Sequence, residues 1–141
     1  MLCDSIAPWK TTRWLVYSSF SFLIPSFISY YKQSYFLSNV LLCASVVSIN
    51  HWRDAKFNSL RRKIDLPVSK LCCGIIFIYN LFYVSLLLHR ILIYTSLCIL
   101  LCCFYLSNVL YKNTNVWCIY HFLFHMQCTC IALLITYTIK I

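Results

Sequence analysis

Charged residues are scarce in this chain of 141 residues, of which 11% are charged and only three are acidic. Soluble domains carry roughly a quarter of their residues as Asp, Glu, Lys and Arg, so this composition argues against a soluble fold. Glycine and proline occur once and three times, which leaves little material for hairpin turns and disfavours an all-β protein. Because Asp4 stands where a signal peptide has a basic region, and no small-residue cleavage motif follows, we expect the first apolar segment to be retained.

Apolar residues make up 62% of the chain, and they are gathered into five long runs separated by short polar segments. Each run has about 18–24 residues, enough for a helix to cross a hydrocarbon core of about 30 Å. The pattern predicts an all-α, polytopic transmembrane bundle that forms one domain over residues 1–141, with Pro25 kinking the first span. The predicted spans are about 14–31, 35–52, 65–88, 91–111 and 116–137.

The net charge of +9 comes from basic residues in the gaps between the apolar runs, which argues against nucleic-acid binding. With five spans, one face of the bundle collects Lys10, Arg13, Arg53, Lys56, Arg61, Arg62, Lys63 and Lys112. The opposite face has only Lys32, Arg90 and Lys140. The positive-inside rule therefore predicts that the N-terminus is cytosolic, in a multi-pass protein of the endoplasmic reticulum or plasma membrane.

The positions of the tryptophans and cysteines also fit a helical membrane bundle. We expect an interfacial aromatic belt at the cytosolic face from Trp9, Trp14, Trp52 and Trp117. Nine of the ten cysteines lie inside apolar runs and are interpreted as small apolar helix residues. Neither adjacent pair, Cys72–Cys73 or Cys102–Cys103, has the C-x-x-C spacing of a zinc or redox site.

Ionisable residues inside apolar spans are costly and are often functional. His121 and His125 are four residues apart, so they share one face of the last predicted helix. The five-span topology places His51 and Asp65 at similar depth at the same membrane face, whereas His89 falls at the other face. Three imidazoles and a water form a catalytic zinc sphere, so the metal candidates are His51, His121 and His125.

The remaining polar residues suit two further roles at such a zinc ion. Asp65 is the candidate to take the proton of the zinc water or to orient a histidine ligand. Ser48 is the candidate donor to the developing oxyanion; it lies with Ser45 and His51 on a polar stripe that we expect to face the bundle interior.

The ordered set of Ser48, His51, Asp65 and the His121-x-x-x-His125 motif resembles the CREST superfamily of membrane hydrolases, which includes the alkaline ceramidases and the progestin and adipoQ receptors. The resemblance implies that the three histidines bind zinc, that Asp65 holds the zinc water and that Ser48 assists at the substrate carbonyl. The implied reaction is hydrolysis of a lipid amide such as ceramide. The chain departs from the family in having five predicted spans instead of seven, and Val47 stands where the family has its serine.

Other interpretations remain open at this stage. Asp65 is equally suited to cap a helix that has Pro67 in its first turn. The histidines and serines are suited to form hydrogen bonds between helices. Haem is a rival cofactor, ligated by His51 and one histidine of the last span, although no second pair suggests a two-haem protein. The alternative function is that of a non-enzymatic scaffold or accessory subunit, with membrane lipids as the partners in either case.

Overall fold

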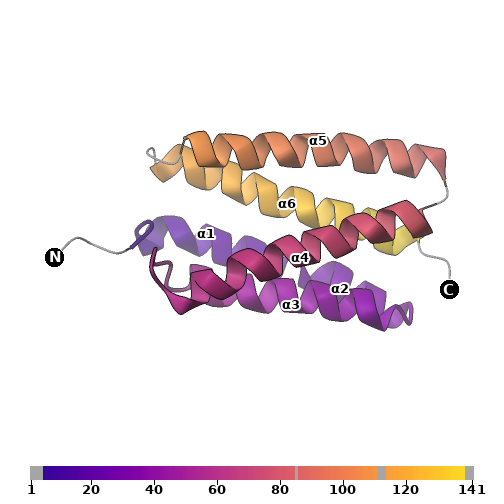
Figure 1. Ribbon diagram of the computed structural model, residues 1–141, viewed down its shortest axis with the longest axis horizontal. Helices are drawn as coiled ribbons and strands as arrows, with labels where there is room; N and C mark the ends of the chain where they lie inside the picture. Colours follow the sequence, from indigo (N-terminus) through magenta and orange to yellow (C-terminus); the bar gives the residue numbers. More distant parts are fainter. Residues whose placement is uncertain (1–4, 85, 111–113, 139–141) are drawn as a thin grey trace.

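Six helices, all running roughly along the long axis of the molecule, form the described part of the chain (Figure 1). The computed structural model describes residues 5–84, 86–110 and 114–138. Within these ranges there is no strand, only an isolated bridge between Ser5 and Lys56, so the prediction of an all-helical protein is confirmed. The helices are α1 (Trp9–Phe20), α2 (Leu23–Tyr31), α3 (Tyr35–Trp52), α4 (Leu60–Tyr83), α5 (Leu87–Val109) and α6 (Thr114–Thr138).

Three of the helices, α4, α5 and α6, are long and apolar enough to cross a membrane. They identify the chain as a membrane protein by the length and hydropathy of the helices. The first two predicted spans correspond to α1 with α2 and to α3. α1 and α2 have 12 and 9 residues, and they lie end to end beside α3 (Figure 1). The full count of five spans and the cytosolic N-terminus therefore stay predictions.

The break between α1 and α2 lies at Ser21 and Phe22, one turn before Pro25. Proline has no amide hydrogen, so Pro25 cannot donate to the Ser21 carbonyl four residues earlier. The amide of Ile24 donates to this carbonyl instead, at 3.2 Å, which tightens the chain locally. The kink predicted from Pro25 thus becomes a complete interruption, whereas the predicted bounds of the second span, 35–52, coincide with α3.

The start of α4 differs from the prediction. The helix begins at Leu60 and not at Asp65, because the Ser59 hydroxyl accepts the amide of Arg62 at 3.2 Å and caps it. The interpretation of Asp65 as a helix cap is therefore wrong: Asp65 lies in the second turn, and Pro67 is inside the helix. The basic run from Arg61 to Lys63, predicted as loop, is helical.

The connection between α4 and α5 lies earlier in the chain than predicted. α4 ends at Tyr83, five residues earlier than predicted, and Val84 already has an extended backbone. α5 begins at Leu87, so His89 and Arg90 belong to its first turn and do not form the connection.

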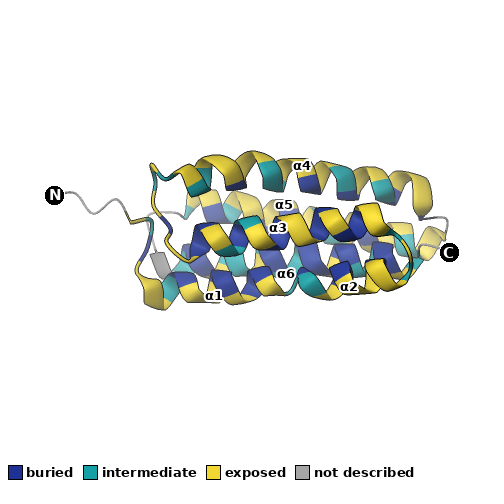
Figure 2. Ribbon diagram, turned by 90° about the horizontal axis from the view of Figure 1, so that it is seen from below, coloured by how far each residue is buried: buried dark blue, intermediate teal, exposed yellow. Residues whose placement is uncertain are grey.

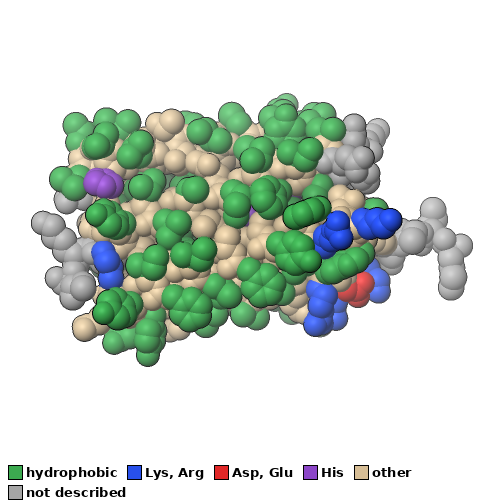
Figure 3. Space-filling model, turned by 180° about the vertical axis from the view of Figure 1, so that it is seen from behind, with side chains coloured by type: hydrophobic (Ala, Val, Ile, Leu, Met, Phe, Trp, Pro, Cys, Tyr) green, Lys and Arg blue, Asp and Glu red, His purple; other side chains and the backbone are tan. Residues whose placement is uncertain are grey.

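α6 is the central helix of the bundle. It packs against α1, α2, α4 and α5, and 39% of its most apolar segment is buried, compared with 11% in α4 and in α5. The outer sides of α4 and α5 are largely exposed (Figure 2), and hydrophobic side chains cover the flank of the molecule while most Lys and Arg gather at one end (Figure 3). An apolar flank with basic residues at one end is the surface expected of a protein embedded in a bilayer.

Removing the α4 cap should loosen the start of this helix. We expect Ser59→Ala to lower the free energy of unfolding by about 1 kcal/mol and to increase amide exchange in the first turn of α4. Ser34 is the matched control, because it precedes α3 without a side-chain capping bond. Equal exchange in the Ser59→Ala and Ser34→Ala variants would show that the capping bond contributes nothing.

Candidate functional site

Ser48 and Asp65 are brought into direct contact between α3 and α4. The Ser48 hydroxyl donates to Oδ1 of Asp65 at 3.1 Å, and Ser69, one turn further along α4, donates to the same oxygen at 3.2 Å. Asp65 is 6% exposed, and among the residues that the structure describes no Lys or Arg forms an ion pair with it. Two hydroxyl groups therefore hold a buried carboxylate whose second oxygen, Oδ2, accepts no hydrogen bond from the described residues.

His51 lies one turn after Ser48 on α3 and is 3% exposed. Its Nδ1 atom is fully buried and has no hydrogen-bond partner in the part of the chain that the structure describes. Asp65 and Arg62 both lie close enough to His51 to interact electrostatically with the imidazole. An unpartnered ring nitrogen beside a buried carboxylate is costly in an apolar bundle unless a proton, water or ion is shared there.

His121 and His125 lie next to one another on α6, with ring centres 5.1 Å apart. His125 is 3% exposed, and its Nδ1 contacts the hydroxyl of Ser18 on α1 at 2.9 Å. Nδ1 of His121 contacts the hydroxyl of Ser107 on α5 at 3.2 Å. Both histidines are therefore fixed through Nδ1 by a serine of a neighbouring helix.

The hydrogen bonds around His125 favour one position of the proton on its ring. Ser18 and Ser19 both direct their hydroxyl hydrogens to the Leu15 carbonyl, at 3.0 and 2.7 Å. With its hydrogen on the Leu15 carbonyl, the Ser18 oxygen is free to accept from Nδ1–H of His125, and this tautomer has a lone pair on Nε2. A histidine oriented in this way through Nδ1 is prepared to bind a metal or accept a proton at Nε2.

Trp52 separates His51 from the other two histidines. Its ring lies 4.5 Å from the ring of His51, 4.9 Å from that of His121 and 6.4 Å from that of His125, measured between centres. The side chain is 5% exposed, and its Nε1–H has no hydrogen-bond partner within the described ranges. Trp52 and Trp117, which are in contact at 5.9 Å, are core residues, so the predicted interfacial belt is wrong for these two.

The fit of these residues to a metal ion is partial. Two imidazoles that bind one tetrahedral zinc ion through Nε2 have ring centres about 5 Å apart, which is the separation of His121 and His125. Nε2 of neither residue has a hydrogen-bond partner in the described part of the chain. However, no group of three or more His, Cys, Asp or Glu within that part is arranged to hold a metal ion, and the Trp52 ring packs beside His51.

Several residues of this site were missed by the sequence analysis, namely Trp52, Ser18, Ser69 and Ser107. Trp52 carried a usable signal, because it follows Ser48 by four residues and therefore shares its helix face. Ser69 also carried one, because it follows Asp65 by four residues on the same helix. Ser18 and Ser107 carried none, since contacts between α1, α5 and α6 depend on how the helices pack.

His89 lies near the start of α5, at the end of the bundle away from Asp65, and does not join the site. We define the histidine cluster as Ser48, His51, Trp52, Asp65, His121 and His125. No protein family, no curated protein sequence and no solved structure matches this chain.

Proposed function

We propose that this chain is an integral membrane hydrolase that cleaves a lipid amide of the ceramide type at the histidine cluster, with zinc as the cofactor. The observation that carries the proposal is the contact between Ser48 and Asp65 beside an unpartnered His51 nitrogen. His121 and His125 approach the same end of the bundle from α6. These five residues come from three helices and are separated by up to 77 positions in the chain.

Each residue has a role that follows from its contacts. His121 and His125 would hold the ion through Nε2, and His51 would complete the set after the Trp52 ring has turned aside. When bound, zinc supplies a water that ionises near neutral pH. Asp65 would accept the proton of this water at Oδ2, and the Ser48 hydroxyl would leave Asp65 to donate to the oxyanion of the substrate.

The surrounding bundle supports a lipid substrate. The most apolar segments of α4 and α5 are 11% buried, so a bilayer lipid can approach the bundle along their outer sides. We place the basic end of the molecule, and therefore the histidine cluster, at the cytosolic face of the endoplasmic reticulum or plasma membrane.

Metal analysis of the purified protein tests the proposal. The wild-type chain should contain about one zinc ion per molecule, and both His51→Ala and His121→Ala should lose it. His89→Ala is the matched control and should retain the metal, because His89 is a histidine at the other end of the bundle. A wild-type protein without bound metal after purification in zinc-containing buffer would contradict the assignment.

A second candidate is a non-enzymatic membrane protein in which the histidines join the helices. The observation in its favour is that Ser18 and Ser107 bind Nδ1 of His125 and His121 from two other helices. In this case His125→Ala would destabilise the bundle equally in the presence and absence of zinc. A loss of stability that appears only when zinc is present favours the hydrolase.

A further inference from the structure

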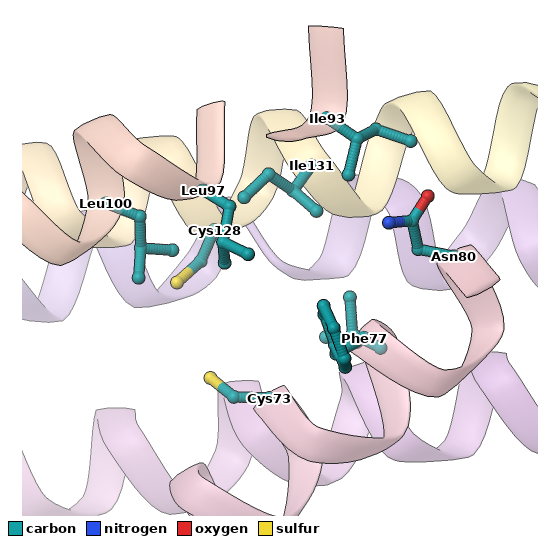
Figure 4. Close-up of a pocket in the computed structure, with 9 residues that line it drawn as sticks. Cys73, Phe77, Asn80, Ile93, Leu97, Leu100, Cys128 and Ile131 are labelled. Atoms are coloured by element: carbon teal, nitrogen blue, oxygen red, sulfur yellow. The ribbon is translucent and has the colours of Figure 1, made fainter. Parts of the chain in front are cut away.

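A cavity lies between α4, α5 and α6; it begins at Cys128, one helical turn from His125, and extends towards the other end of the bundle. Its volume is about 60 Å³, and the empty space is about 440 Å³ when its open side is included. α4 and α5 follow one another in sequence but make no extensive contact, because α4 packs mainly on α3 and α5 on α6. The cavity is therefore a groove that opens sideways, where a membrane protein meets lipid, and α6 contributes Cys128 and Ile131 to its lining (Figure 4).

Asn80 is the polar residue in this apolar groove. It is 1% exposed, and neither Oδ1 nor Nδ2 of its amide has a hydrogen-bond partner among the described residues. The other lining residues include Cys73, Phe77, Leu97 and Leu100 (Figure 4). An amide buried in apolar surroundings costs several kcal/mol when its donor and acceptor are both unpaired. The groove therefore lacks a group that both accepts from Nδ2 and donates to Oδ1.

We propose that this groove binds a neutral single-chain lipid, a monoacylglycerol, whose adjacent hydroxyl groups pair with the Asn80 amide. One hydroxyl would donate to Oδ1 while its neighbour accepts from Nδ2, which satisfies both unpaired atoms. No charged side chain from the described part of the chain lines the groove, so a neutral head group is favoured over a carboxylate or phosphate. The groove is apolar and open on one side, so an acyl chain would lie along it without being enclosed.

The position of Asn80 along α4 places the lipid as in a bilayer, with its head group at the interface and its acyl chain towards the centre. Asn80 is three residues from the end of α4, about 4.5 Å from that end of the helix, so the glycerol group reaches the interface. Cys73 lies about 10 Å deeper along α4, towards the bilayer centre, and the acyl chain runs in that direction. This site lies at the end of the bundle away from Asp65, and its assignment does not depend on the proposed hydrolase.

Photolabelling of the full chain in nanodiscs tests this site. A monoacylglycerol with a diazirine in its acyl chain should label α4, α5 and α6 at the groove, as mapped by mass spectrometry. In competition, 1-monooleoylglycerol should displace the probe about tenfold more effectively than methyl oleate, which has no hydroxyl donor. Asn80→Leu should reduce labelling by about tenfold and abolish this difference between the competitors.

The matched control is Asn108→Leu, which removes an exposed asparagine of α5 outside the groove and should leave labelling unchanged. Without ligand, Asn80→Leu should melt at the same or a higher temperature than the wild type, because it removes two unpaired buried atoms; its loss of labelling then cannot be attributed to unfolding. Labelling spread evenly over the outer sides of α4 and α5 would overturn the proposal. The proposal would also be overturned if methyl oleate or oleic acid displaced the probe as well as, or better than, 1-monooleoylglycerol.

Discussion

Asp65→Asn is expected to reduce the rate of ceramide hydrolysis by at least about a hundredfold, the usual contribution of a general base. The asparagine carbonyl can still accept the hydroxyls of Ser48 and Ser69, so the packing of α3 on α4 should persist. An amide has no affinity for the proton that we propose Asp65 accepts, so the chemical step should fail while the substrate still binds. The measurement is kcat and KM for a fluorescent ceramide in detergent micelles. We expect kcat to fall and KM to stay nearly unchanged.

Asp54→Asn provides the control for this experiment. Asp54 is an exposed aspartate that pairs with Lys56 at 3.2 Å and Arg61 at 3.4 Å, outside the histidine cluster. Exposed ion pairs contribute about 1 kcal/mol or less, so hydrolysis should stay within twofold of the wild type. If the wild-type protein cleaves ceramide and Asp65→Asn cleaves it equally well, the carboxylate has no part in the reaction.

Trp52→Ala is expected to have the largest effect on stability, lowering the free energy of unfolding by about 3–5 kcal/mol. The indole is 5% exposed and contacts the rings of His51, His121 and Trp117, so alanine would leave a cavity where α3 meets α6. Reversible unfolding in mixed detergent micelles, followed by circular dichroism, measures this difference.

Trp14→Ala is the control variant, because it removes a tryptophan that lies on the surface and not in the core. Trp14 is 51% exposed on α1, and its ring contacts the neighbouring Arg13 and Tyr17. Its removal should change stability by less than about 1 kcal/mol. Similar losses for the two variants would mean that Trp52 is not a packing residue of the core.

The apolar runs predicted the helices well, because the length of a membrane helix is dictated by the thickness of the bilayer. The bounds of α3 were predicted to the residue, and those of α6 within two residues. The start of α4 was missed because Arg61, Arg62 and Lys63 interrupt the hydropathy of a helix that Ser59 caps. Hydropathy reports transfer into lipid, whereas the first turn of a helix depends on local hydrogen bonds.

The site was partly predictable for a different reason. Periodicity and topology placed Ser48 near Asp65 and His121 beside His125, because these relations depend on helix register and on shared depth. The position of His51 relative to the other histidines depends on which side chain fills the space between α3 and α6. Trp52 fills it, and its role depends on the rotation of α3 about its own axis, which periodicity alone does not set.

The early start of α4 also determines where a lipid would meet Asp65. The helix is about 36 Å long, against about 30 Å for the hydrocarbon core, so roughly one turn extends beyond it. If this turn is the first, the basic residues from Arg61 to Lys63 stand among the phosphates, and Asp65 lies just beneath them, at the level of the linkages that join head groups to acyl chains. A lipid amide would then reach the carboxylate by lateral diffusion within its own leaflet, without being lifted from the bilayer.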